Sequence, residues 1–312
     1  MTNAMKDISV IIVNWNTKEL LRSCVSSVQA DVEGIAEIIV VDNGSSDGSQ
    51  DMIHVEYPEV VLIENKKNLG FAKANNVGIK KMTRRYACLV NSDVIVLPGC
   101  MNVLAEYMNA NSGVGVVGPR VLWPNMTIQD SCRKYPTLWN NLCESIRLNK
   151  IFPHSNLFSS EHMMYFKHDR LIEVDGLVGC CMMIRKIALD EVGLFDESFF
   201  IYSEETDLCK RMSESGWKII FNPKAQIIHY GRGSSSKEPL TFALEQQKSK
   251  MKYWKKHNSK LSVIIYKSLL VARHIIRLIY GHILLLKRPS DKREIKEKIK
   301  KIKYSITLIV QQ

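Results

Sequence analysis

An apolar run at residues 87–90 leads directly into the polar triplet Asn91-Ser92-Asp93. The run predicts a buried strand, and ligands of open α/β sheets bind beyond the carboxyl ends of the strands. The triplet would bring an amide and a carboxylate to that edge, where a carboxylate can hold a divalent cation and the cation a diphosphate. Taken alone, Asn91 and Asp93 are explained better as a turn that caps the helix after Pro98.

Polar residues also gather at four other places where a strand ends, a loop runs or a helix begins. They are Asp42-Asn43, residues 68–76, residues 204–207 and residues 229–234. A carboxylate such as Glu205 could accept a proton from an attacking hydroxyl, although the dipole of the predicted helix also favours acids at its start. No Walker A loop, G-x-G-x-x-G turn or G-x-S-x-G elbow occurs in the chain, so the clusters belong to none of these sites.

The period of the apolar residues predicts the elements that hold these clusters. Strands are expected at residues 8–13, 37–41, 60–63, 87–90 and 114–117, with helices at 20–28, 71–82 and 101–108. Residues 120–170 read as a long loop, followed by a strand at 175–184, helices at 186–192 and 203–215, and short strands at 217–221 and 226–229. The alternation predicts an α/β fold: a mostly parallel, Rossmann-like sheet flanked by helices.

The composition limits the class of protein. At 312 residues the chain is long enough for one large domain and an appendage. Its eight cysteines are scattered, form no C-x-x-C pair and lie mostly in apolar runs, which indicates reduced, buried thiols in a cytosolic protein. The N-terminal residues read as a first strand and not as a signal peptide.

The net charge of +11 is concentrated at the C-terminal end. Residues 237–312 hold 19 Lys and Arg against 5 Asp and Glu, whereas residues 1–236 hold 24 against 27. A nearly neutral body argues against nucleic-acid binding. The basic tail is expected to meet an anionic surface.

Residues 261–286 have the length of a membrane span, but their charges favour another arrangement. Five basic residues fall within one arc of about 140° on a helical projection: Lys260, Lys267, Arg273, His274 and Arg277. This pattern is typical of an amphipathic helix that lies in a membrane interface. The alternative is a pair of helices packed on the body or on a second subunit, so a homodimer is also open.

Taken together and in order, the polar clusters resemble a known family. Residues 41–48, 68–76, 91–93, 195–208 and 229–231 are similar to the motifs of the family 2 inverting glycosyltransferases of the GT-A fold. The rhamnosyltransferase-like branch, which builds bacterial surface polysaccharides, is the most similar. The resemblance covers roughly residues 7–236, so it implies a GT-A catalytic domain at 1–236 and a basic amphipathic helical tail at 237–312.

The resemblance implies which residues bind the donor. Asp42 matches the acid that holds the base or ribose, although it also suits a turn. Asn68, Gly70 and Asn75 match the segment along the nucleotide, and Gly70 could equally serve a positive backbone φ. Asn91 stands where the commonest family motif has a first Asp.

The resemblance also implies a metal site and a catalytic base. Asp93 matches the acid that binds Mg²⁺ or Mn²⁺, and His229 matches a histidine that completes the site, although a lone histidine is often structural. Glu205 aligns with the base, usually Asp, with Glu204 as the neighbouring candidate. Arg232 is expected to touch the diphosphate from a loop that is a candidate lid. From helix spacing, Asp207 is expected to cap the helix or to pair with Arg211 four positions later.

The resulting prediction is a metal-dependent, inverting glycosyltransferase. Its donor would be a nucleotide sugar such as dTDP-rhamnose. Its acceptor is expected to be a saccharide, lipid-linked because the tail seeks a membrane. The expected location is cytoplasmic, peripheral on the inner face of the cell membrane. Two alternatives stay open: a catalytically degenerate membrane scaffold, and a nucleotidyltransferase, for which residues 14–17 lack the expected glycine-rich loop.

Overall fold

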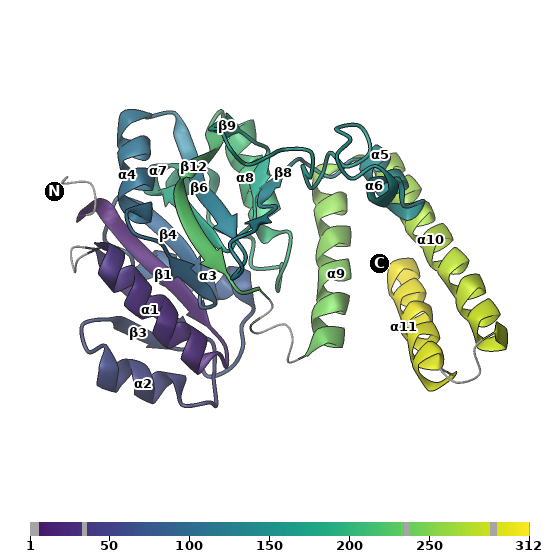
Figure 1. Ribbon diagram of the computed structural model, residues 1–312, viewed down its shortest axis with the longest axis horizontal. Coiled ribbons are helices and arrows are strands. Elements are labelled where there is room, and N and C mark those ends of the chain that lie inside the picture. Colours follow the sequence, from purple (N-terminus) through teal and green to yellow (C-terminus); the bar gives the residue numbers. More distant parts are fainter. Residues whose placement is uncertain (1–5, 33–35, 232, 234–237, 288–291, 312) are drawn as a thin grey trace. The chain divides into compact units, whose positions relative to one another are not determined.

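The computed structural model describes residues 6–32, 36–231, 233, 238–287 and 292–311. Contacts within the chain divide it into two compact units (Figure 1). Met1–Tyr135 and Phe166–Phe242 form the first, which we call the sheet unit; Pro136–Tyr165 and Ala243–Gln312 form the second, the helical unit. The helical unit therefore combines most of the basic tail with a segment from the middle of the chain.

In the described part of the sheet unit, ten strands form one mixed sheet. Its main order is β3-β2-β1-β4-β11-β6-β12-β5, with β7 beside β6 and β9 beside β12. The strands are β1 (Ile8–Asn14), β2 (Glu37–Asp42), β3 (Val61–Glu64), β4 (Tyr86–Asn91), β5 (Val94–Val96), β6 (Val114–Leu122), β7 (Ile128–Gln129), β9 (Ile172–Glu173), β11 (Cys181–Arg185) and β12 (Lys218–His229). The first four in this order are parallel, as predicted. β11 runs antiparallel between β4 and β6, which the sequence did not indicate.

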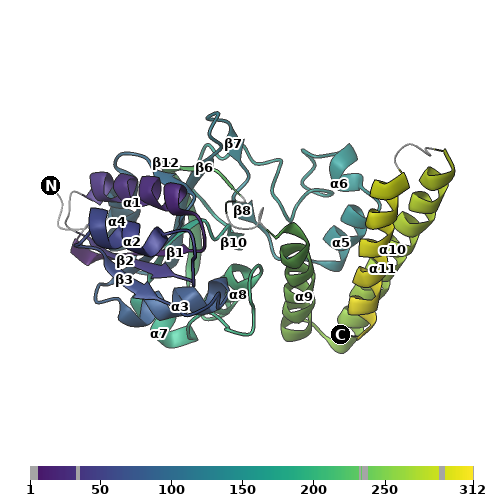
Figure 2. The same cartoon turned by 90° about the horizontal axis from the view of Figure 1, so that it is seen from below.

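Helices cover both faces of the sheet (Figure 2). One face carries α1 (Lys18–Val32), α2 (Ser49–Glu56) and α4 (Cys100–Ala110), and the other carries α3 (Phe71–Lys81), α7 (Lys186–Val192) and α8 (Glu204–Glu214). Successive residues of a strand point to opposite faces. Val10 therefore joins the core under α1, while Ile11 meets α3 at Gly78. All eight cysteines are buried and free, which confirms the prediction of buried thiols.

Two predicted strand boundaries are wrong. The strand expected at 175–184 is divided into β10 (Gly176–Leu177), which pairs with β8 (Cys132–Arg133), and β11 in the main sheet. The chain changes sheet at residues 178–180, where Val178 N donates to Ser131 O. The two short strands expected at 217–229 are one strand, β12, with an irregularity between Asn222 and Gln226. Pro223 lies there and cannot donate to a ladder.

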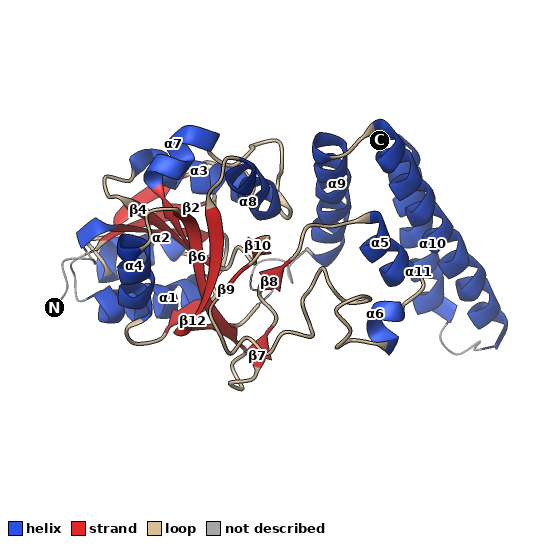
Figure 3. Ribbon diagram, turned by 90° about the horizontal axis from the view of Figure 1, so that it is seen from above, coloured by secondary structure: helices blue, strands red, loops and turns tan. Residues whose placement is uncertain are grey.

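The helical unit holds α5 (Leu138–Ser145), α6 (Leu148–Ile151), most of α9 (Pro239–His257), α10 (Lys260–Lys287) and α11 (Lys292–Gln311) (Figure 3). The prediction of a loop over 120–170 is therefore wrong at α5, which begins with a capping box between Thr137 and Asn140. Trp254 of α9 stacks on Tyr266 of α10, with ring centroids 4.4 Å apart. In the described chain, no helix is both long and apolar enough to cross a membrane.

Candidate functional site

The sheet register gathers the predicted site residues at one edge. Asn14 of β1 lies opposite Asp42 of β2, and Val13 lies opposite Asn91 of β4. β11 runs the other way, so the residues just before it come to the same edge: Cys180 O accepts a hydrogen bond from Asn91 N at 2.9 Å. The strand-end clusters of the sequence are thus neighbours in space.

Asp42 is completely buried, and its carboxylate is already bound by protein groups. It accepts hydrogen bonds from Asn14 Nδ2 at 2.9 Å, Ser45 N at 2.8 Å and Gln50 Nε2 at 2.8 Å. A carboxylate has about four acceptor positions, so these bonds occupy most of them. In this structure Asp42 shapes the loop after β2, and its contact with a nucleotide stays a prediction.

The segment at residues 68–70 is fixed by side-chain amides and by close backbone packing. Asn43 Nδ2 donates to Asn68 Oδ1 at 2.8 Å, and the same oxygen accepts from Gly70 N at 2.9 Å. Gly70 has φ +85°, and a Cβ there would lie 2.4 Å from Phe200 O. Of the two roles open for Gly70, the structure therefore supports the positive φ and the close approach.

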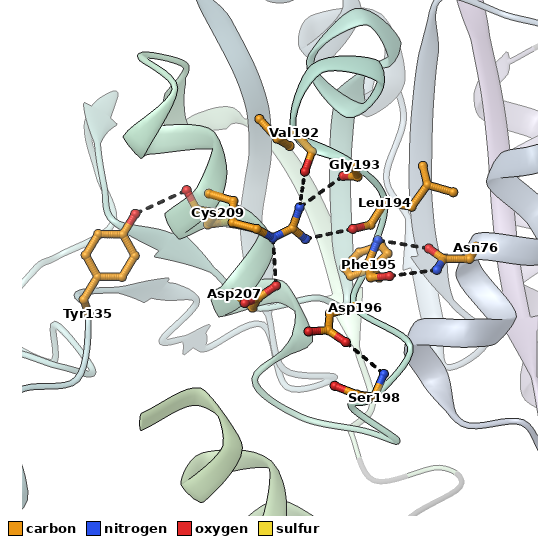
Figure 4. Close-up of polar contacts among 11 residues, drawn as sticks. Asn76, Tyr135, Val192, Gly193, Leu194, Phe195, Asp196, Ser198, Asp207 and Cys209 are labelled. Carbon is orange, nitrogen blue, oxygen red and sulfur yellow. Dashed lines mark hydrogen bonds and ion pairs between the residues drawn. The ribbon is translucent and has the colours of Figure 1, made fainter. Parts of the chain in front are cut away.

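Two consecutive asparagines of α3 have different contacts. Asn75 is buried and donates to Phe71 O at 2.9 Å within its own helix. Asn76 donates to Phe195 O at 2.9 Å and accepts from Phe195 N at 3.0 Å, so it ties α3 to the loop before α8 (Figure 4). Asn75 was predicted as a site residue; Asn76, which anchors the loop, was not.

Asp93 and His229 form the polar pair predicted as a metal site. His229 Nε2 lies 3.3 Å from Asp93 Oδ1, and Gly233 N donates to Asp93 Oδ2 at 3.1 Å. His229 Nδ1 lies 2.7 Å from Gln129 Oε1, an oxygen that can only accept, so Nδ1 carries a proton. With a proton on Nε2 as well, the ring donates to the Asp93 carboxylate; in the neutral ring Nε2 and the carboxylate are two acceptors that face each other. Such a pair attracts a proton or a cation between its atoms, so these residues fit a divalent ion.

The protein supplies only part of a coordination shell. Among the described residues, no group of three or more His, Cys, Asp or Glu could hold a metal ion. Mg²⁺ usually keeps several waters and binds one or two carboxylates together with substrate phosphates, so two protein ligands are enough. Burial raises the pKa of Asp93, but the hydrogen bonds from His229 and Gly233 outweigh it and lower that pKa overall. Arg232 lies outside the described residues.

Glu204 and Glu205 open α8 as a buried acidic pair. Tyr202 and Ser203, at φ +68° and +67°, turn the chain into the helix. Burial raises the pKa of Glu204, and the charge of Glu205 raises it further. Burial also raises the pKa of Glu205, against a smaller opposing effect of Arg133. One oxygen of each carboxyl, Oε2, is buried and has no hydrogen-bond partner among the described residues.

Glu205 is the member of the pair with access to the strand-end edge. It is half-buried, whereas Glu204 is buried. A Cβ on Gly179 would lie 3.7 Å from Glu205 Cβ, and Gly179 directly precedes Cys180, the partner of Asn91. Arg133 was missed by sequence reasoning, because it stands alone in a segment read as loop.

Asp207 and Arg211 secure the same helix. Arg211 Nε donates to Asp207 Oδ2 at 2.9 Å, which confirms the predicted pair (Figure 4). The guanidinium also donates to Val192 O at 2.7 Å and Leu194 O at 2.8 Å. Asp207 is wholly buried, so it orients Arg211 and holds α8 against the loop after α7.

Comparison with known proteins identifies the family. The sequence model of glycosyl transferase family 2 matches residues 9–193, more than half of the chain. The chain belongs to glycosyl transferase family 2. This family 2 chain is 26% identical, over 77% of its length and 81% of the relative's, to the N-acetylglucosaminyl-diphospho-decaprenol L-rhamnosyltransferase of Mycobacterium tuberculosis. It is also 28% identical to a low-salt glycan biosynthesis hexosyltransferase of Haloferax volcanii, over 66% of this chain and 62% of the relative.

Solved structures confirm the predicted GT-A-like fold. The family 2 chain superposes on GalNAc-T7, crystallised with UDP, GalNAc and Mn²⁺, with a TM-score of 0.57 and 17% identity, over 73% of this chain but only 44% of that one. It also superposes on a mannosyltransferase of Pyrobaculum calidifontis in complex with GDP-Man and Mn²⁺, with a TM-score of 0.56 and 14% identity. This match covers 98% of this chain and 86% of the mannosyltransferase. At these identities the likeness concerns the fold alone.

Proposed function

We propose that this family 2 glycosyltransferase moves a sugar from a nucleoside-diphosphate donor to a lipid-linked saccharide, with inversion at the anomeric carbon. The observation that carries the proposal is the shared edge of the sheet. Asp93 and His229 face each other there, and Gly179, which lies against Glu205, directly precedes Cys180, the partner of Asn91. Glu205 Oε2 has no hydrogen-bond partner among the described residues.

The donor is assigned to the carboxyl ends of β1, β2 and β4. Asp42, Asn68, Gly70 and Asn75 shape the loop and helix start that would lie along the nucleotide, and Asn91 and Arg232 would approach the diphosphate. A divalent cation, Mg²⁺ or Mn²⁺, held by Asp93 and His229 would neutralise charge on the leaving nucleoside diphosphate.

Glu205 is assigned the role of general base. As the acceptor hydroxyl attacks C1 of the sugar, its proton passes to the Glu205 carboxylate, and the bond from C1 to the diphosphate oxygen breaks. A single displacement inverts C1, so a β-linked donor gives an α product. Glu204 keeps its proton more readily, because it is more buried and lies beside Glu205.

The relatives support a more specific substrate and location. The mycobacterial relative is named as an L-rhamnosyltransferase of a diphosphate-linked decaprenol. We therefore propose dTDP-rhamnose as the donor and a lipid-linked saccharide of bacterial surface polysaccharide synthesis as the acceptor. We also propose that the enzyme works at the cytoplasmic face of the membrane that holds the acceptor, with residues 1–236 as the catalytic part and the basic tail toward the membrane.

The test is a donor panel on the full-length protein with Mn²⁺. UDP-, dTDP- and GDP-sugars are each incubated with a lipid-linked saccharide, and release of nucleoside diphosphate and the anomeric configuration of the product are measured. We expect one nucleotide class to be used, with inversion, and Glu205→Gln to reduce the rate by about 100-fold or more. No release from any donor by a folded protein, or a product with retained configuration, would contradict the proposal.

A further inference from the structure

One face of α10 exposes an unusual number of large apolar side chains. Eight of them are 39–66% exposed: Leu261, Ile264, Ile265, Ile275, Ile276, Ile279, Tyr280 and Ile283. At 100° per residue they fall within one arc of about 160°. We call these eight residues the α10 apolar face.

The opposite side of α10 is partly buried and contains charged and polar groups. Tyr266, Leu270 and His274 are buried there. Arg273 is 15% exposed and pairs with Glu144 of α5, with Nη1 3.2 Å from Oε1. Part of the predicted basic stripe thus faces the interior of the helical unit and does not face outward. A helix on a water-soluble protein usually exposes its charged side and buries its apolar side. α10 instead exposes eight large apolar side chains while Arg273 is largely covered.

The helical unit as a whole is rich in exposed apolar groups. It contains 100 of the 312 residues but 16 of the 25 large apolar side chains that are exposed in the described chain. Contiguous exposed apolar surface marks an interaction site with a protein or a membrane.

The charge of the same region decides between these two partners. Lys255, Lys256 and Lys260 are exposed just before the α10 apolar face, and Lys296, Lys300 and Lys301 are exposed on α11, which contacts α10. A second copy of the chain would bring the same positive charge to the contact. An anionic lipid surface offers the opposite charge together with an apolar interior.

We propose that the α10 apolar face inserts into the interface of an anionic lipid bilayer, with the helix lying along the membrane surface. The isoleucines would reach the boundary between headgroups and acyl chains, while the exposed lysines stay among the anionic headgroups. Arg273 and His274 would act inside the helical unit and not on the lipid. This proposal names the surface behind the membrane location given in the proposed function, and its biological purpose rests on that function. Vesicle binding can nevertheless be tested without measuring sugar transfer.

The test uses the full-length protein and sedimentation with vesicles of phosphatidylcholine and phosphatidylglycerol in equal parts. Ile279→Glu should weaken vesicle binding about tenfold, and Ile276→Glu with Ile279→Glu about 100-fold, because charges must then enter the interface. Ile187→Glu on α7 is the matched control, since Ile187 and Ile279 are both 57% exposed. The control should bind vesicles like the unchanged protein.

Two further measurements identify other occupants of this face. The first is size-exclusion chromatography without vesicles. If the unchanged protein elutes as a dimer, the variant with both Ile→Glu changes elutes as a monomer, and vesicle binding is the same for both, the face is a contact between copies and the proposal is overturned. A marked loss of melting temperature in the same variant, again with unaltered vesicle binding, would show that another part of the chain covers the face and would also overturn it.

Donor turnover separates this proposal from the proposed function. Slow release of nucleoside diphosphate in vesicle-free buffer should be equal in the unchanged protein and in Ile279→Glu. If vesicle binding depends on Ile279 but no donor is turned over, the proposed function fails and the membrane proposal stands. If donors are turned over but vesicle binding is the same in Ile279→Glu, the membrane proposal fails and the proposed function stands.

Discussion

Glu204 and Glu205 form the most unusual electrostatic feature of the site. Glu204 is buried and Glu205 is half-buried, and each has a buried carboxyl oxygen without a protein partner in the described chain. Their pKa values are raised, chiefly by burial, so the folded protein holds their protons to a higher pH than the unfolded chain does. The stabilisation from this effect is complete below the ordinary glutamate pKa and is lost as the pH rises through the raised values.

Glu204→Gln should therefore stabilise the protein only where the carboxyl would be charged. We expect the melting temperature to rise by about 2–4 °C at pH 8 and to change little at pH 4, as measured by circular dichroism. Asp207→Asn on the same helix is the control and should lower the melting temperature at pH 8, because it weakens the bond to Arg211. If Glu204→Gln instead lowers the melting temperature at pH 8 as much as Asp207→Asn does, burying the charged Glu204 carboxylate does not destabilise the fold.

Several features of single residues could be predicted from the sequence because they depend on local spacing. Asp207 and Arg211 are four positions apart on a helix and form the expected pair. Asp93 and His229 were matched through family motifs, and the structure brings their side chains together. The charge of Arg133 acts on Glu205 because two segments that are distant in the sequence lie near each other, and no local pattern predicts this.

At the scale of elements, the loop at residues 68–70 and the start of α8 are fixed to each other by backbone contacts. Phe71 N donates to Phe200 O at 2.6 Å, and Gly70 leaves no room for a side chain beside the same oxygen. The predicted donor segment and the proposed catalytic carboxyls are therefore positioned as one structure.

Gly70→Ala should disturb this structure more than a change of backbone propensity would. Both the φ of +85° and the 2.4 Å approach to Phe200 O oppose a Cβ, so we expect a loss of about 2–4 kcal/mol in the free energy of unfolding in urea. Gly99→Ala is the matched control: its φ is +81°, but no atom lies within 4 Å of the added Cβ, so a loss of about 1 kcal/mol is expected. Equal losses in the two variants would contradict a role for the Phe200 contact.

The parallel part of the sheet was predictable because continuous apolar runs alternate with amphipathic helices. The insertion of β11 between β4 and β6 was not, since pairing between distant strands leaves no period in the sequence. The break at residues 178–180 was missed for the same reason. The backbone there forms hydrogen bonds with Ser131 and Asn91, which lie outside the local segment.

At the scale of the whole molecule, the chain combines a sheet unit that holds the predicted site with a helical unit that carries the net positive charge. The sequence predicted an amphipathic α10 and the position of its basic stripe. It could not show that α5, from the middle of the chain, would pair with Arg273 and cover part of that stripe. Periodicity defines the two sides of a helix, but the partner of each side depends on long-range packing.

The most direct measurement is the binding of dTDP, UDP and GDP to the full-length protein by calorimetry, with Mn²⁺ and with EDTA. The central claim is that Asp93 at the sheet edge holds a divalent cation for the diphosphate. We expect one nucleotide to bind only with Mn²⁺, and Asp93→Asn to weaken binding about tenfold or more. Asp190→Asn, which changes an exposed acid of α7, should bind like the unchanged protein. Binding that is equally tight in Asp93→Asn, or that persists in EDTA, would contradict the assignment of this site.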